Sequence, residues 1–182
     1  VKKACRETEG EMLYYGGELV MQPLFFSSSG GKTENSQDVF VGAYPYLVSV
    51  SSPYEQEATH TNEKKEFTFE YIEQALSSGY PDRPTGKITT ESINILSRTA
   101  GGRVAQMQVG QATFKGTEIR KALGLSSALF SVEVEAENKV IFTSDGSGHG
   151  VGLSQYGAVG MAQKGSDYKE ILTHYYTGTK VY

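Results

Sequence analysis

Tryptophan is absent from the 182 residues, and there is only one cysteine, Cys5. A single thiol forms no internal disulfide and supplies no multi-thiolate metal site. The three histidines, His60, His149 and His174, are far apart in the sequence, and no His-Glu-x-x-His pair is present. The sequence therefore predicts no metal site and no cofactor in this chain.

Long apolar runs and basic clusters are also missing. No run approaches the roughly 18–20 residues that a membrane span needs, and residues 1–7 lack the apolar stretch of a signal peptide. The chain does not begin with Met, so we expect a piece of a longer protein, with any export signal or membrane anchor before Val1. The net charge of −4 and the lack of a basic patch argue against nucleic acid as a partner.

Two pairs of β-prone runs predict hairpins. The runs 12–15 and 19–26 flank Gly16-Gly17, and the runs 93–96 and 103–109 flank Gly101-Gly102. A further strand alternates apolar and polar residues through Phe130, Val132 and Val134, and turns through Glu137-Asn138 into residues 140–142.

Four short helices are predicted from their start and stop signals. They are residues 69–78 after Thr68, residues 118–123 between Thr117 and Gly124, a helix from Ser154 to before Gly165, and a helix from Ser166 to Gly178. Hairpins and short helices occur without regular strand-helix alternation, which favours an α+β fold. We expect residues 1–182 to form a single domain, as one compact unit or two lobes.

Two loops are candidates for ligand binding. Residues 27–36 are rich in turn formers and hydroxyl groups, and apolar runs at both ends favour an ordered loop over a flexible linker. Residues 148–158 place polar side chains among glycines where a loop enters a helix, so backbone N–H groups there can meet acceptor oxygens such as those of a sugar. The alternative is purely structural, with the glycines permitting turns and His149 bonded to the backbone.

The second loop and the helix that follows carry a specific resemblance. The continuous segment 148–158, followed by Met161-Ala162, Gly165, Tyr168, Ile171-Leu172, His174-Tyr175-Tyr176 and Gly178, resembles the carboxyl-terminal signature of the stage II sporulation protein D family and its amidase-enhancer relatives. The order of segments from Thr8 to Tyr54 is also similar, so the resemblance runs nearly end to end.

The resemblance implies a peptidoglycan lytic transglycosylase that acts during sporulation engulfment on glycan strands stripped of stem peptides. In such an enzyme one carboxyl protonates the glycosidic oxygen and then assists the muramyl 6-hydroxyl, which closes a 1,6-anhydro ring. The implied partners are the glycan strands, a sporulation amidase and the membrane scaffold of the engulfment machinery. The implied location is outside the cytoplasm, with a membrane anchor in a segment that these residues do not include.

Two features of the family have no counterpart here. The catalytic glutamate belongs to an Ala-Glu-Met-Pro-like segment, which this sequence lacks, so no catalytic residue is assigned and the segment is expected upstream. The zinc cluster of some members is likewise expected before Val1. The resemblance carries over only glycan-binding positions: Ser28, Ser29, Gly30, Lys32, Thr33, His149, Gln155 and Tyr156.

Two other functions compete with this interpretation. A chain without the catalytic glutamate can be a non-catalytic glycan-binding module or an amidase activator. A weaker alternative is a hydrolase that uses His149 with a nearby carboxylate such as Asp145.

Overall fold

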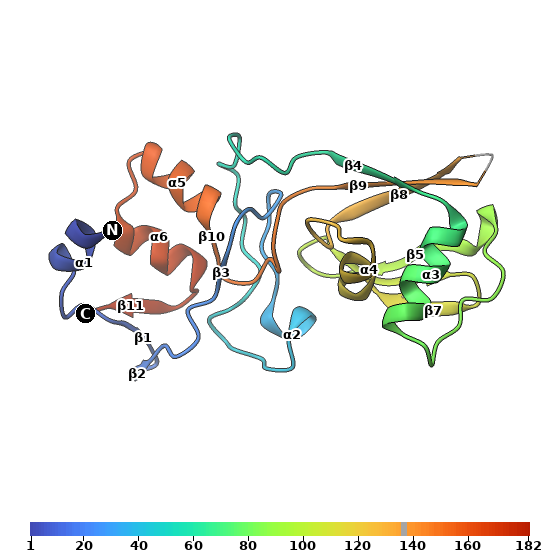
Figure 1. Cartoon of the computed structure of the whole chain (residues 1–182). Helices are drawn as coiled ribbons and strands as arrows, with labels where there is room; N and C mark the ends of the chain where they lie inside the picture. Colours follow the sequence, from blue (N-terminus) through green and yellow to red (C-terminus); the bar gives the residue numbers. More distant parts are fainter. Residues whose placement is uncertain (136–137) are drawn as a thin grey trace.

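The protein has an α+β fold drawn out into two lobes (Figure 1). The computed structural model describes residues 1–135 and 138–182. The first lobe contains both ends of the chain, and the second lobe is one continuous segment inserted into it. Two separate apolar clusters, one in each lobe, account for this division.

The first lobe is built from short elements at both ends of the sequence. They are α1 (Lys2–Glu7), β1 (Leu13–Tyr15), β2 (Glu18–Leu19), β3 (Phe25–Phe26), α2 (Ser36–Val39), β10 (Leu153–Ser154), α5 (Gln155–Gln163), α6 (Tyr168–Tyr175) and β11 (Thr179–Val181). Strand β1 pairs antiparallel with β2 and with β11, and β3 pairs parallel with β10. Both chain ends therefore lie at the same end of the molecule (Figure 1).

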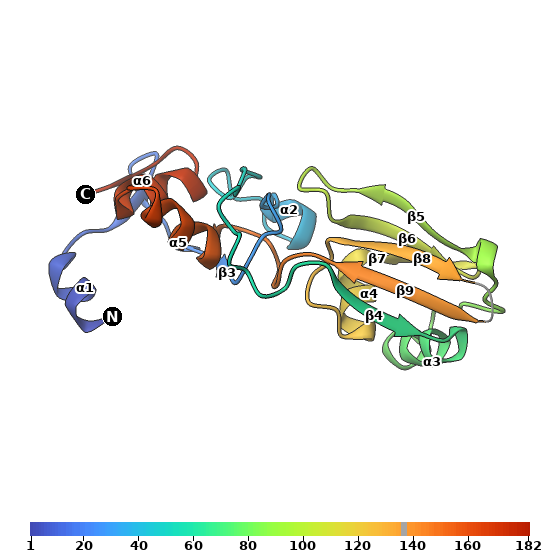
Figure 2. The same ribbon diagram turned by 90° about the horizontal axis from the view of Figure 1, so that it is seen from above.

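The second lobe contains the larger sheets. Its elements are β4 (Glu63–Phe67), α3 (Phe69–Gly79), the 3₁₀-helix η1 (Thr90–Ser92), β5 (Ile93–Arg98), β6 (Val104–Val109), β7 (Ala112–Lys115), α4 (Gly116–Leu123), β8 (Phe130–Glu135) and β9 (Lys139–Ser144). The antiparallel sheets have the orders β4-β9-β8 and β5-β6-β7. Strands β4 and β9 run alongside each other and connect this lobe to the first (Figure 2).

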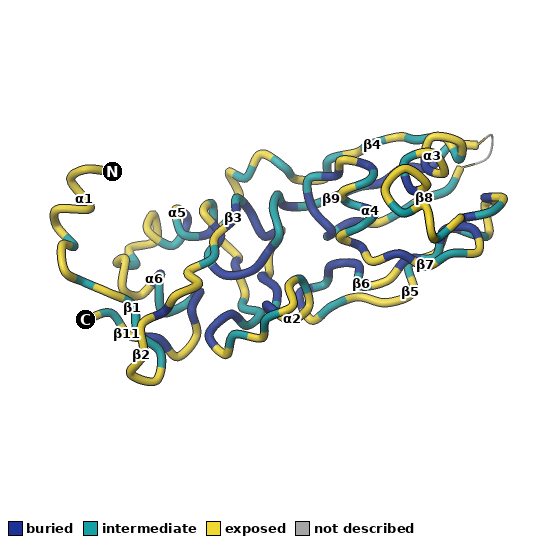
Figure 3. Tube along the Cα trace, turned by 60° about the horizontal axis from the view of Figure 1, so that its bottom comes forward, coloured by how far each residue is buried: buried dark blue, intermediate teal, exposed yellow. Residues whose placement is uncertain are grey.

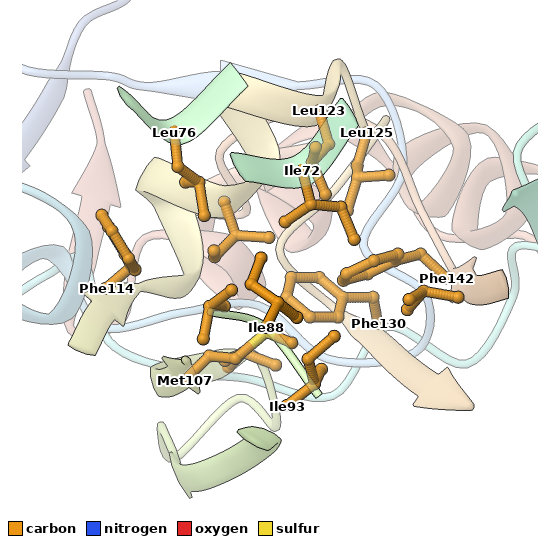
Figure 4. Close-up of a cluster of buried hydrophobic side chains, with 14 residues drawn as sticks. Ile72, Leu76, Ile88, Ile93, Met107, Phe114, Leu123, Leu125, Phe130 and Phe142 are labelled. Atoms are coloured by element: carbon orange, nitrogen blue, oxygen red, sulfur yellow. The ribbon is translucent and has the colours of Figure 1, made fainter. Parts of the chain in front are cut away.

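One apolar core holds the second lobe together. Side chains from α3, α4 and both sheets converge there, including Ile72, Leu123, Met107 and Phe142 (Figure 4). Met107 has no exposed surface, and burying a side chain of this size contributes about 1.5–3 kcal/mol. Helix α1, in contrast to this buried core, is exposed along its whole length (Figure 3).

The local predictions are mostly confirmed. Both hairpins form, Thr68 accepts a hydrogen bond from Tyr71 N at the start of α3, and Ser154 accepts one from Gly157 N at the start of α5. Helix α4 ends at Gly124 as predicted, but it begins after Lys115 instead of Thr117. Helix α6 is capped by Asp167 instead of Ser166, because the Asp167 carboxylate accepts from Glu170 N. Glu137, in the predicted turn, lies outside the described residues.

Two packing interpretations are wrong. The helical pattern of residues 69–78 predicts that Tyr71 packs on the buried face of α3 with Ile72, but Tyr71 is half exposed and stacks on Phe67 instead. The charge and polarity of residues 55–66 predict a solvated surface insert, but the carboxylate of Glu55 is bonded to three separate segments of the first lobe.

Candidate glycan site at the junction of the lobes

The two predicted loops lie side by side where the lobes meet. Ser28 N donates to Ser147 O at 3.1 Å, Glu34 N donates to Gly150 O at 2.8 Å, and Tyr156 N donates to Ser27 O at 3.0 Å. Strands β3 and β10, which border the two loops, are paired as well. Segments more than 100 residues apart in the sequence therefore form one surface, which the sequence predicted only as two separate loops.

Glu55 joins the two loops. Its Oε2 accepts hydrogen bonds from Ser29 N at 2.8 Å and Gly30 N at 2.9 Å. Its Oε1 accepts from Ser52 Oγ at 2.8 Å and from Ser154 Oγ. Successive backbone N–H groups in a turn form a concave anion site, and here a side chain of the same protein occupies it. Glu55 is thus an anchor between segments.

A directed chain of hydrogen bonds supports this anchor. The hydroxyl proton of Ser52 points to Glu55, so Tyr175 Oη must donate to Ser52 Oγ, at 2.6 Å. Gly157 leaves room for this contact, because a Cβ at that position would lie 2.0 Å from Tyr175 Oη. Tyr175, the buried tyrosine of α6, therefore packs in the core and not on a ligand. Burial raises the pKa of its hydroxyl.

A second buried network connects the first loop to the second lobe. Arg103 Nη1 lies 3.4 Å from Glu34 Oε1, and the same guanidinium donates to Lys32 O and to Ser29 O. Thr99 Oγ1 also donates to Glu34 Oε1, at 2.8 Å. Burial raises the pKa of Glu34 against the opposing effect of Thr99 and Arg103, and burial also lowers the pKa of Arg103. Arg103 therefore holds the backbone of the first loop, residues 27–36, which we call the Ser-Gly loop.

His149 packs between two aromatic rings. Its ring centroid lies 5.5 Å from that of Phe26 and 5.3 Å from that of Phe40. Its Nδ1 accepts from Val151 N at 3.1 Å, which places the proton of the neutral ring on Nε2. Burial lowers the pKa of His149, and the positive charges of Arg120 and Arg103 lower it further, while the backbone of Phe25 opposes them.

The eight predicted binding residues differ in exposure. The buried ones are Ser28, Ser29 and Thr33, and the exposed ones are Gly30, Lys32 and Gln155, with His149 and Tyr156 half-buried. Thr33 Oγ1 accepts from Val50 N at 2.8 Å, and Ser29 Oγ accepts from Gly31 N at 2.9 Å, so these hydroxyls shape the loop. The geometry does not test a role in glycan binding for any of them, and this role stays a prediction.

The carboxylate of Asp145, close to the second loop in the sequence, makes a structural contact. Asp145 Oδ1 accepts from Asn62 N at 2.7 Å, so it fixes the loop at the start of β4. No cluster of three or more His, Cys, Asp or Glu side chains suited to a metal ion occurs within residues 1–135 and 138–182. In the same part of the chain, no helix has both the length and the apolar character to cross a membrane.

The fold and the junction define an α+β protein in which two loops from one lobe are fixed against the other lobe. The chain belongs to the family described as "Domain of unknown function (DUF8618)", which matches residues 45–152. The matched segment covers the whole second lobe and the first half of the signature loop, residues 148–158.

Relatives align with the entire chain. It is 36% identical over 182 residues to stage II sporulation protein D of Bacillus subtilis and 35% identical to that of Bacillus amyloliquefaciens, in each case over 100% of this chain and 50% of the relative. It is 25% identical over 225 residues to the amidase enhancer of B. subtilis, over 97% of this chain and 32% of the relative. The predicted resemblance is confirmed, and the chain spans about half the length of the sporulation relatives.

Proposed function

We propose that this chain is the glycan-binding body of a peptidoglycan lytic transglycosylase that acts in sporulation. The observation that carries the proposal is the meeting of the Ser-Gly loop and the signature loop on Glu55. Similarity over the whole of this chain to half of stage II sporulation protein D supports the sporulation role. The exposed residues Gly30, Lys32 and Gln155 would contact the sugar, and the buried hydroxyls beneath them would keep the loop in shape.

The proposed reaction needs one acid, which we place outside these 182 residues, in the longer protein. Its carboxyl proton passes to the glycosidic oxygen as the bond from that oxygen to the muramyl anomeric carbon breaks. The muramyl 6-hydroxyl then bonds to the same carbon and returns its proton to the carboxylate. No water is consumed, and the products are a free 4-hydroxyl and a 1,6-anhydromuramyl end. Zinc, if present in the longer protein, would be held by residues outside this chain.

The test compares the 182-residue chain with the longer protein on glycan strands stripped of stem peptides. We expect 1,6-anhydromuramyl ends, detected by mass spectrometry, from the longer protein alone, and strand binding by both. Anhydro products from the short chain would place the acid within it. Reducing ends would indicate a hydrolase instead. A matched pair, Lys32→Ala in the loop and Lys180→Ala in β11, tests the surface: only the first should weaken binding.

A second candidate is a glycan-binding amidase activator without cleavage activity. The similarity to the amidase enhancer over 97% of the chain favours it. It predicts that the longer protein binds strands and accelerates a cell-wall amidase while releasing no new glycan ends. The proposed location, outside the cytoplasm and anchored to the membrane by another segment, applies to both candidates.

A further inference from the structure

A cationic pocket borders the signature loop on the second lobe. It has a volume of about 460 Å³ and is lined by Thr117, Arg120, Lys121, Gly124 and Leu125. Helix α4, which supplies three of these residues, lies at the end of the second lobe that faces the first (Figure 1). Gly148 N donates to Ser126 O at 3.1 Å. Because Ser126 directly follows Leu125 of the pocket lining, the pocket is next to the signature loop.

Arg120 has no anionic partner within the described residues. Its Nε donates to Leu125 O at 3.3 Å, which orients the guanidinium and leaves its two terminal nitrogens without a hydrogen bond to described residues. The nearest glutamate along the helix, Glu118, is already bonded to Arg83. Among the residues that the structure describes, no carboxylate lines the pocket.

The surroundings make this arginine costly to leave unpaired. Arg120 is half-buried, and burial lowers its pKa with no carboxylate to oppose the effect. Lys121 adds a second cation, and Lys65 Nζ lies 2.6 Å from Gly124 O. In a chain of net charge −4, this local positive site is suited to attract an anionic group.

We propose that this pocket binds the lactyl carboxylate of a muramyl residue, with Arg120 as the bidentate donor. The inference rests on the proposed glycan function and names what the site recognises in its substrate. A muramyl residue differs from N-acetylglucosamine by a lactyl ether, and the carboxylate of this ether is free only after the stem peptide has been removed. A planar guanidinium matches a carboxylate in geometry as well as charge. The pocket thus selects stripped strands.

The test uses two tetrasaccharides with the same β-1,4 hexosamine backbone. One alternates N-acetylglucosamine with N-acetylmuramic acid and carries free lactyl carboxylates, and the other contains N-acetylglucosamine alone. Calorimetric titration of the intact protein should show tighter binding of the muramyl ligand. Arg120→Gln should weaken that binding by roughly tenfold to a hundredfold and leave the other ligand unaffected. Arg120→Lys should bind the muramyl ligand with an affinity between those of the unsubstituted protein and Arg120→Gln, since lysine retains the charge but not the planar pair of donors.

Two controls separate recognition from folding. Lys180→Gln removes one exposed cation from β11 and should change neither affinity, and thermal unfolding of each variant shows whether α4 is intact. Equal weakening of both ligands by Arg120→Gln, or no weakening of either, would refute the carboxylate proposal while leaving glycan binding in place. Failure of the unsubstituted protein to bind either tetrasaccharide would remove the proposed function together with this inference.

Discussion

Arg103 Nη1 lies 3.4 Å from Glu34 Oε1 at the junction of the lobes, and the two side chains are 3% and 0% exposed. Glu34 comes from the Ser-Gly loop, and Arg103 directly precedes β6. Glu34 Oε2 and Arg103 Nε have no hydrogen-bond partner within the described residues. Desolvation therefore offsets much of the attraction, and the pair is better suited to fixing the position of the loop than to adding stability.

The first prediction concerns this pair. Arg103→Met should lower the free energy of unfolding by about 3–5 kcal/mol, because it leaves the Glu34 carboxylate buried without its cation. The double variant Glu34→Gln/Arg103→Met should lose less, since no buried charge remains. Urea unfolding of all variants gives the comparison.

A partly exposed ion pair provides the control for this prediction. Arg83 Nη2 lies 2.7 Å from Glu118 Oε1, with side-chain exposures of 40% and 20%. Arg83→Met should cost about 1 kcal/mol or less of ionic stabilisation. If the losses from Glu34→Gln and Arg103→Met simply add in the double variant, the two residues are not coupled.

The second prediction concerns Glu55. Glu55→Ala removes the acceptor of two backbone N–H groups and two hydroxyls, so we expect a loss of about 2–4 kcal/mol in the free energy of unfolding. Glu57→Ala, on the same loop but exposed, should stay within about 0.5 kcal/mol of the unsubstituted protein. Similar losses in the two variants would mean that Glu55 is not an anchor.

The sequence predicts the local structure of this protein well because the signals are local. Thr68 and Gly124 mark a helix start and a helix end, and Gly16-Gly17 marks a tight turn, whatever the rest of the chain does. The β1–β11 and β3–β10 pairings have no such signal. They join segments more than 100 residues apart, and short strands of two or three residues show no readable period.

The sequence predicts the two loops of the candidate site but not the contacts between them. Both loops were found from their glycines, hydroxyls and family resemblance, yet Glu55 resembles a surface residue because its neighbours Gln56 and Glu57 are polar and exposed. The acceptor that joins the loops is recognisable only once Ser29, Ser52 and Ser154 are known to meet. Arg103, the first residue of a hairpin run, likewise gave no sign of its buried partner.

The third prediction uses the close approach at Gly157. A Cβ there would lie 2.0 Å from Tyr175 Oη and 2.2 Å from Ser52 Oγ, so Gly157→Ala should destabilise the protein by about 3 kcal/mol. Gly79→Ala, at the end of α3 with nothing within 4 Å, should be neutral or stabilising by up to about 1 kcal/mol. Thermal unfolding measures both. A neutral Gly157→Ala would show that the Tyr175–Ser52 contact is not tightly packed.

The last prediction is a pH dependence from His149. Because burial holds its folded-state pKa below the ordinary value of 6.5, the unfolded chain binds a proton before the folded protein does. The neutral ring therefore stabilises the fold fully above pH 6.5, and this contribution is lost as the pH falls from 6.5 towards the folded-state pKa. The slope for one such group is at most about 1.4 kcal/mol per pH unit. Asparagine retains an acceptor for Val151 N, so His149→Asn should remove the His149 contribution to the pH dependence of the free energy of unfolding. Urea unfolding at several pH values below 6.5 measures this dependence. The control His174→Asn leaves His149 in place and should retain the contribution. The same slope in His149→Asn as in the unsubstituted protein would show that the buried ring does not titrate with folding.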